Sequence, residues 1–187
     1  MNSSSARNTG LRKAVDLRHT ARRLYKAMLP DIRRYEAAKR QATKALEKSA
    51  KGVVSIKCKA PDVFTVCMLH GLALENIFKA ALVNQNPHLI DRNKISPKLL
   101  KHNLTKLAEA ANISLSNNEK QILDWLTEVV VWQVRYQVPT NSRQLGIFWA
   151  MDHTIGENIR SFNKTVDTVF KRVEATLKPN VPKSRYR

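Results

Sequence analysis

The segment DVFTVCMLHGLALENIFKAALV, from Asp62 to Val83, is the most apolar part of the chain and decides the fold. Asp62 directly follows Pro61 and is a favourable N-cap, so we expect a helix from Val63 to about Val83. Apolar residues cover nearly the whole circumference of this helix, which is typical of a central helix surrounded by others. Its polar residues must then be paired or face a cavity. They are His70, Glu75, Asn76 and Lys79.

Helical periodicity continues on both sides of this segment. Apolar residues recur at steps of three and four through residues 11–49, and again from Phe148 to Leu177. Because proline lacks a backbone donor and disfavours helix at the residue before it, Pro30 predicts a kink or break in the first region. The last region predicts one long helix.

Two further helices are expected in the middle of the chain. Residues 84–100 carry turn signals and predict a loop, and a short helix follows at about 103–111. A capping box at Ser116 and Glu119 opens a helix that continues through Val134. The sequence therefore predicts an all-α fold, an up-and-down bundle of four to five long helices.

The length and composition fit one domain with basic ends. The chain has 187 residues, of which 43% are hydrophobic, so a single core can be buried. We expect residues 1–10 to be a flexible basic N-terminus and residues 178–187 a basic tail. Residues 11–177 then form a single helical-bundle domain, in which 11–50 is a basic helical region.

The charge is extreme and is concentrated near the N-terminus. The net charge is +18, and residues 1–60 hold 16 Lys and Arg against four acidic residues. A solvated helix face is the ordinary interpretation of such a run. Here too few acids are present to neutralise it, so we expect contact with nucleic acid through backbone charge. An acidic protein would be attracted by the same surface. The residues expected there are Arg18, Arg22, Arg23, Lys26, Arg33, Arg34, Lys39 and Arg40.

Metal and cofactor motifs are not evident. Cys67 and His70 share one helix face, but a structural zinc site needs four ligands, and Cys58 is not at a finger spacing. The sequence has no glycine-rich phosphate loop. We therefore predict no metal and no cofactor. Two cysteines, the lack of a secretory signal and the lack of an apolar run near the roughly 20 residues of a membrane span favour the cytoplasm.

The stretch WQVRYQVP, from Trp132 to Pro139, places two polar residues at the inner end of an apolar helix. Arg135 and Tyr136 are therefore either covered and paired, or exposed at the rim of a cleft. Glu75 and Lys79 are four residues apart, the spacing at which opposite charges pair on a helix.

Three segments resemble the HEPN-like helical proteins in order and spacing. They are HGLALENIFK at 70–79, KHNLTKL at 101–107, and Trp132-x-x-Arg135-Tyr136-x-x-Pro139. The resemblance covers residues 63–177. It implies a bundle of four to five helices, dimerisation, and a role as an RNase or as an accessory partner of a nucleotidyltransferase in defence or toxin–antitoxin systems.

The resemblance also implies that charged groups from the three segments meet inside the bundle. They would form a buried polar network, which acts in function or serves as a structural device that fixes helix register. By the resemblance, the residues near one another would be Glu75, Lys79, His102, Arg135 and Tyr136. The residues that we expect in the buried network are His70, Glu75, Lys79, His102 and Arg135.

The usual catalytic pair of the RNase members is not found. Those proteins carry an arginine followed, after four to six residues, by a histidine near the start of a late helix. After Arg135 the next histidine is His153, and Arg12 with His19 has the spacing but lies in the first helical region. We therefore expect a non-catalytic binding module that contacts nucleic acid, RNA more than DNA.

Two alternatives stay open. One is a metal-independent endoribonuclease assembled across a dimer, and the other is an interaction module for a nucleotidyltransferase or antitoxin partner. The candidate catalytic residues are His102, Arg135 and Tyr136, with His153 as a further candidate.

Overall fold

The computed structural model describes the backbone of most of the chain. The described residues are 3–48, 55–56, 58–91, 94–133 and 142–177, with the side chains of 3–4, 6, 132–133 and 142–158 left out.

Five α-helices make up most of this structure, which confirms the all-α prediction. They are α1 (Ser3–Glu47), α2 (Val63–Gln85), α3 (Leu104–Ala110), α4 (Asn117–Gln133) and α5 (Ser142–Thr176). The predicted loop between α2 and α3 contains two 3-10 turns, Pro87–Leu89 and Pro97–Leu100. It also contains a small antiparallel pair, β1 (Ile90–Asp91) and β2 (Lys94–Ile95), which the sequence patterns did not predict.

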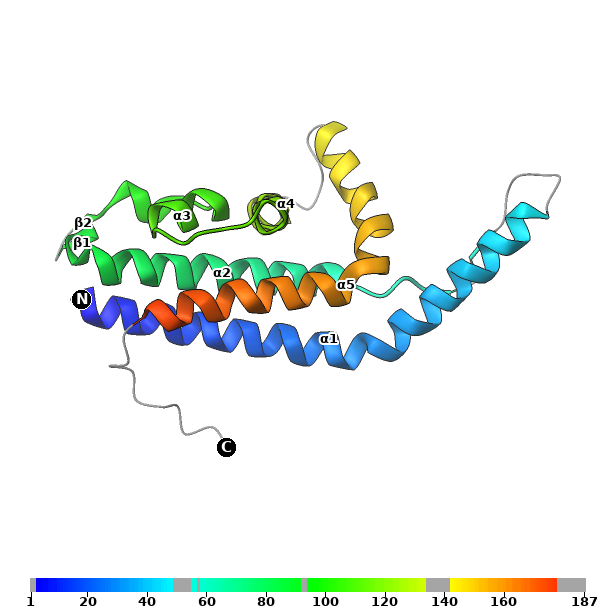
Figure 1. Ribbon diagram of the computed structural model, residues 1–187, viewed down its shortest axis with the longest axis horizontal. Helices are drawn as coiled ribbons and strands as arrows, with labels where there is room; N and C mark the ends of the chain where they lie inside the picture. Colours follow the sequence, from blue (N-terminus) through cyan, green and yellow to red (C-terminus); the bar gives the residue numbers. More distant parts are fainter. Residues whose placement is uncertain (1–2, 49–54, 57, 92–93, 134–141, 178–187) are drawn as a thin grey trace.

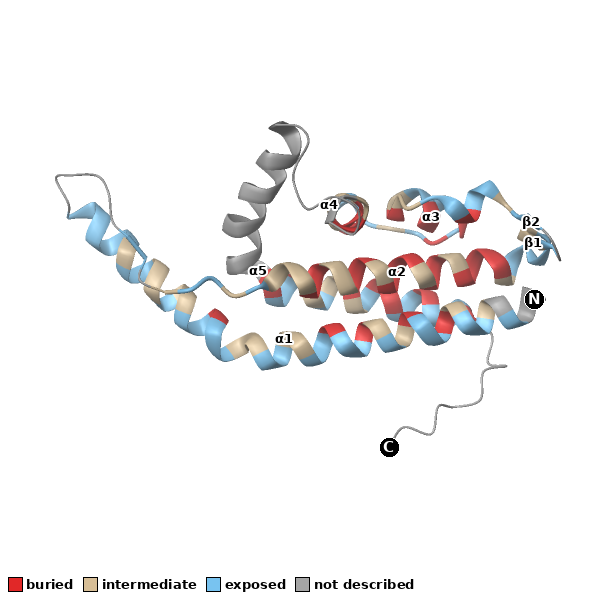
Figure 2. Ribbon diagram, turned by 180° about the vertical axis from the view of Figure 1, so that it is seen from behind, coloured by how far each residue is buried: buried red, intermediate tan, exposed pale blue. Residues whose placement is uncertain are grey.

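Helix α2 lies at the centre of the molecule, as its apolar circumference predicts. Figure 1 shows α1 and the second half of α5 running beside it, while α3 and α4 cover its other side. Helix α4 is seen end-on in this view, so it crosses α2 rather than running along it. Buried residues follow α2 along its length (Figure 2). Its fully buried side chains include Leu74, Ile77 and Phe78.

By length and composition α2 could also cross a membrane, contrary to the expectation that no segment reaches that length. Its most apolar 18-residue window has a mean hydropathy of 1.5, and 72% of that window is buried against the rest of the protein. Such burial is what a core helix shows, because its apolar surface is already removed from solvent.

Local chemistry fixes where α2 begins and how closely α4 approaches it. The backbone N–H of Thr65 donates to Oδ1 of Asp62 at 3.2 Å, so Asp62 is the N-cap, as predicted. A Cβ added at Gly71 would lie 2.4 Å from Cγ2 of Val130. Glycine at this position therefore lets the two helices cross at close range.

Helix α1 differs from its prediction at its start and near Pro30. It begins at Ser3 rather than at Leu11, and Nη1 of Arg7 donates to Oδ1 of Asn84 at 2.7 Å. The helix is continuous through Pro30, so no break occurs there. In Figure 1 its second half turns away from the bundle, which agrees with the kink that proline favours.

Candidate nucleic-acid interface

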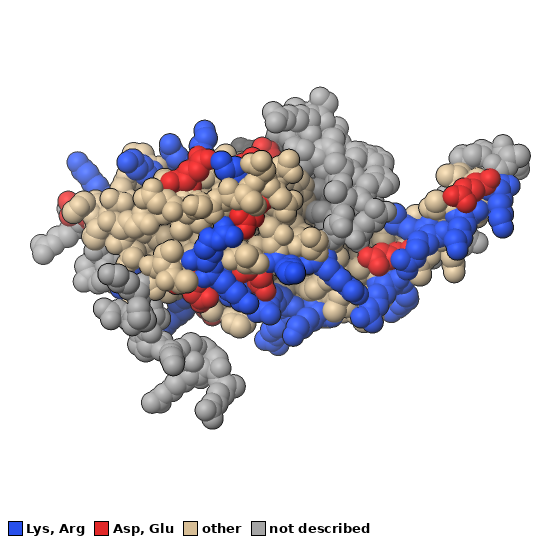
Figure 3. Space-filling view, viewed as in Figure 1, with Lys and Arg blue, Asp and Glu red and all other residues tan. Residues whose placement is uncertain are grey.

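Helix α1 presents a row of exposed basic side chains. Four of them, Arg22, Lys26, Arg33 and Arg40, are separated by four, seven and seven positions. On an ideal helix these spacings place them within about 40° of one another around the axis. Arg23 and Arg34 flank the row and are also exposed. We call these six residues the basic face, and Figure 3 shows Lys and Arg along α1 and onto its outer end.

Lys39, a seventh predicted residue, is half-buried. Its Nζ lies 6.0 Å from the centre of the Tyr35 ring. This is the outer limit at which a cation is attracted to an aromatic face.

Arg18 does not belong to this surface, contrary to the prediction. It is 7% exposed, and its Nε donates to Oδ1 of Asp167 on α5 at 2.9 Å. Its guanidinium carbon lies 4.5 Å from the centre of the Phe170 ring. The reason is its register, because Ala14 and Ala21, four residues before and three after, are fully buried on the same stripe. Arg18 therefore joins α1 to α5.

Acidic side chains neutralise little of the basic face. Arg22 Nε lies 3.7 Å from Asp167 Oδ2, and Arg34 Nη2 lies 3.1 Å from Asp31 Oδ1. These arginine side chains are 45% and 75% exposed, so solvent screens both pairs. Within the described part of the chain, no ion pair joins a carboxylate to the other members of the face. These are Arg23, Lys26, Arg33 and Arg40.

The outer part of α1, residues 33–47, projects from the bundle, and we call it the arm (Figure 1). None of its residues is buried. It holds five Lys and Arg against two Glu. A helix that buries so little is not held in place by a core, and its charge is free to meet a partner.

A second site lies between α2 and the start of α3. Nζ of Lys79 donates to Oε1 of Glu75 at 2.6 Å, and Nδ1 of His102 lies 3.0 Å from the same oxygen. The side chain of Glu75 is only 9% exposed, against 22% for Lys79 and 34% for His102. Three of the five residues predicted to form a polar network are therefore in direct contact.

The other oxygen of this carboxylate has a different environment. Oε2 of Glu75 is buried and has no hydrogen-bond partner among the described residues. Arg135 and Tyr136, which the resemblance brings to this network, lie outside the described residues, and the side chain of His153 is also not described.

His70 belongs to a separate cluster. It is fully buried, and its Nε2 lies 2.8 Å from Oδ1 of Asn163 on α5. Because Nδ2 of Asn163 donates to the carbonyl of Ile159, Oδ1 is the acceptor and Nε2 carries the proton. Burial, the largest cause, lowers the pKa of His70 below its usual 6.5. His70 is thus a neutral core histidine that links α2 to α5.

Sequence reasoning missed an ion pair between α4 and α5. Arg172 Nη2 lies 2.8 Å from Oε1 of Glu119, and Arg172 also donates to the carbonyl of Ser114. The predicted capping box is confirmed, since the N–H of Ser116 donates to Oε2 of Glu119. The hydrogen bond from Arg172 is the main reason why the pKa of Glu119 is lowered. Glu119 therefore caps α4 and also pairs with Arg172 on α5, and the capping motif alone did not indicate the second contact.

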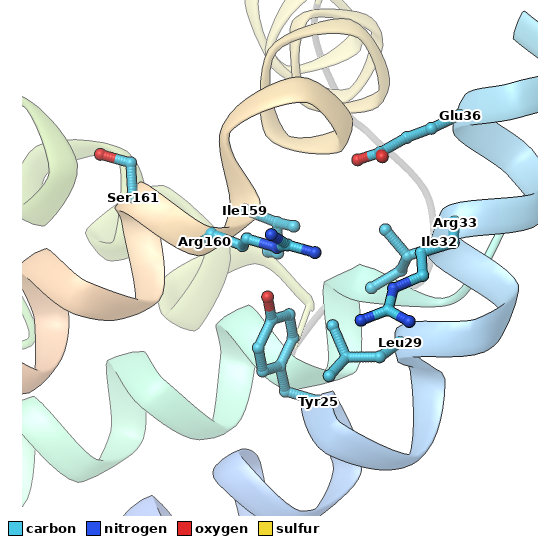
Figure 4. Close-up of a pocket in the computed structure, with 8 residues that line it drawn as sticks. All are labelled: Tyr25, Leu29, Ile32, Arg33, Glu36, Ile159, Arg160 and Ser161. Carbon is cyan, nitrogen blue, oxygen red and sulfur yellow. The ribbon is translucent and has the colours of Figure 1, made fainter.

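A cleft of about 350 Å³ lies where α1 and α5 diverge (Figure 4). Five of its lining residues come from α1 and three from α5. They are Tyr25, Leu29, Ile32, Arg33, Glu36, Ile159, Arg160 and Ser161. The sequence patterns assigned no role to this set, apart from the place of Arg33 on the basic face.

The cysteines show no metal-binding arrangement in the described ranges. Cys67 is buried in α2, and burial raises the pKa of its thiol well above the usual value. Among the described residues, no group of three or more His, Cys, Asp or Glu side chains could hold a metal ion.

No known protein family, curated protein or solved structure matches this chain. In the described ranges, the fold and its surface define a mostly helical protein of five packed α-helices with a strongly basic first helix.

Proposed function

We propose that this protein is a HEPN-like helical binding module that contacts nucleic acid, RNA more than DNA, through the basic face of α1. The observation that carries the proposal is the row of exposed cations on one side of α1, most of them without a carboxylate partner among the described residues. Phosphates repeat along a nucleic acid, so a row of cations along one helix can contact several of them. Neutralising them releases bound counterions, which drives association.

The HEPN-like part of the proposal is supported by the cluster at Glu75. The resemblance implies that Glu75, Lys79 and His102 meet, although the segments that supply them are separated in sequence, and they are in contact. The preference for RNA follows from the same resemblance. A role in a defence or toxin–antitoxin context is part of this proposal.

The non-catalytic part of the proposal rests on the contacts of His102. Its Nδ1 is engaged with a buried carboxylate that also binds Lys79, an arrangement typical of a structural ion pair. Incubation of the protein with RNA in the presence of a chelator tests this point. Cleavage that is lost in His102→Ala and Arg135→Ala would establish an endoribonuclease instead.

Nucleic-acid binding is tested with two variants that change the charge equally. The face variant replaces Arg23, Lys26, Arg34 and Arg40 by Gln. The control variant replaces four exposed lysines outside α1 by Gln. These are Lys94, Lys98, Lys101 and Lys106.

Fluorescence anisotropy with unrelated RNA and DNA oligonucleotides at low salt gives the affinities. We expect the face variant to bind RNA at least tenfold more weakly than the control variant, because it loses phosphate contacts and not merely net charge. Equal weakening of both variants would contradict the proposed interface. No binding by the wild-type protein at low salt would end the nucleic-acid proposal and favour an acidic protein as partner.

A further inference from the structure

The cleft between α1 and α5 combines groups of three chemical kinds. Arg33 and Arg160 extend into it from opposite helices, and the hydroxyl of Tyr25 points toward Arg160 (Figure 4). The carboxylate of Glu36 points across the gap from the next turn of α1. Leu29 and its apolar neighbours Ile32 and Ile159 complete the lining, while Ser161 points away.

The two arginines define one end of a ligand. Arg33 and Arg160 are both exposed. Within the described ranges, no ion pair joins either guanidinium to a carboxylate. Two guanidinium groups that converge from separate helices suit a phosphate, because their N–H donors match its oxygens. The Tyr25 hydroxyl adds a further donor beside Arg160.

The remaining groups favour a ligand that is larger than a simple anion. A carboxylate repels a phosphate and accepts hydrogen bonds, so Glu36 suits a neutral part of the ligand that donates them, such as a sugar hydroxyl or a base amino group. The half-buried side chain of Leu29 offers an apolar surface for a flat base, and the buried side chains of Ile32 and Ile159 lie behind it in the lining. Phosphate, donor and flat apolar surface together describe a nucleotide.

The size of the cleft favours single-stranded over double-stranded nucleic acid. A volume of about 350 Å³ is near the lower limit of small-molecule pockets, which is enough for one nucleotide and far too small for a double helix. A base inside a duplex is stacked and paired, so it enters such a cleft only at the cost of unstacking and unpairing. A base in a single strand can be turned out into a pocket at small cost.

We infer that this cleft binds one unpaired nucleotide of a single-stranded nucleic acid, with Arg33 and Arg160 on its phosphate. This inference rests on the proposed function and deepens it, since Arg33 belongs to both the basic face and the cleft. The face holds the backbone of either form, whereas the cleft gives the preference for single strands.

The test compares the unmodified protein with two single-charge variants of α5. Arg160→Gln removes a cleft arginine, and Lys164→Gln removes an exposed charge one turn further along the same helix, outside the cleft lining. Tyr25→Phe removes the hydroxyl and keeps the apolar wall. Anisotropy measures binding to a 12-nucleotide single-stranded RNA and to a 12-base-pair RNA duplex.

We expect Arg160→Gln to weaken single-strand binding about tenfold, and duplex binding no more than Lys164→Gln does. Tyr25→Phe should weaken single-strand binding by a smaller factor, about threefold. If Arg160→Gln and Lys164→Gln weaken both RNAs equally, the cleft adds only net charge and the inference is wrong. A circular dichroism spectrum of each variant confirms that the helices remain folded.

Adenosine 5′-monophosphate separates a nucleotide site from an anion site. At equal ionic strength it should displace the single strand at lower concentration than inorganic phosphate, and Arg160→Gln should abolish the difference. Equal displacement by phosphate would overturn the nucleotide assignment. Wild-type protein that binds neither RNA would instead refute the proposed function, and direct titration of the protein with the nucleotide, followed by NMR, would still test the cleft.

Discussion

Replacement of Glu75 by alanine tests the polar cluster between α2 and α3. The carboxylate, 9% exposed, lies 2.6 Å from Nζ of Lys79 and 3.0 Å from Nδ1 of His102. Removing one member of a fully buried ion pair costs about 3–5 kcal/mol, because the remaining charge is left without a partner. Lys79 and His102 are 22% and 34% exposed and regain part of their hydration. We therefore expect Glu75→Ala to lower the free energy of unfolding by about 2–3 kcal/mol.

The chain contains a matched control for this substitution. Glu109 and Lys120 also form a Glu–Lys pair, at 3.5 Å, but their side chains are 55% and 44% exposed. Glu109→Ala should cost less than about 0.5 kcal/mol, since a pair in solvent contributes little. Urea denaturation followed by circular dichroism measures both variants. Equal destabilisation by Glu75→Ala and Glu109→Ala would refute the buried cluster.

Three further predictions concern the contacts of α5 and α4. Gly71→Ala should cost about 1–3 kcal/mol, because its Cβ meets Cγ2 of Val130 at 2.4 Å. Adding Val130→Ala should recover part of the loss, and strict additivity in urea melts would contradict the clash. Arg172→Gln should cost about 1 kcal/mol by releasing the 40% exposed guanidinium from Glu119, and an unchanged denaturation midpoint would disprove it. The lowered pKa of His70 makes the folded state bind fewer protons than the unfolded state, so stability should fall below pH 6.5 by up to about 1.4 kcal/mol per pH unit. His70→Gln should flatten that fall, and an unchanged pH profile would exclude His70 as its source.

The helices could be predicted because their patterns are local. The apolar segment after Asp62, the capping box at Ser116 and the long stripe ending at Leu177 each depend on neighbours within one or two turns, and each helix was found. The pair β1 and β2 was missed because strands of two residues are too short to show alternation.

The position of Arg18 shows where a charge pattern misleads. A rule that counts charged residues places Arg18 with its exposed neighbours, yet its register between Ala14 and Ala21 puts it on the buried stripe. A buried arginine is stable there because Asp167 on α5 supplies the opposite charge. That partner is 149 residues away in sequence and is brought near only by the fold.

The polar residues of α2 belong to different clusters because they lie on different sides of the helix. Glu75 and Lys79 are one turn apart and share a face, so their contact follows from spacing. His70 precedes Glu75 by five positions, which on an ideal helix is about 140° away around the axis. It therefore faces Asn163 on α5, and the predicted single network is at least two clusters. The cleft beside Arg160 depends on where α1 and α5 diverge, which no local pattern encodes.

The central claim is that the charge of α1 is arranged to bind phosphates, and the salt dependence of binding tests it most directly. The measurement is the slope of log affinity against log salt concentration for a DNA duplex. It is made with the wild-type protein, the face variant and the control variant. Each lost phosphate contact should flatten the slope by about 0.9, so the face variant should differ from wild type by about 3 to 4, while the control variant keeps the wild-type slope. Equal slopes for the two variants would contradict the claim.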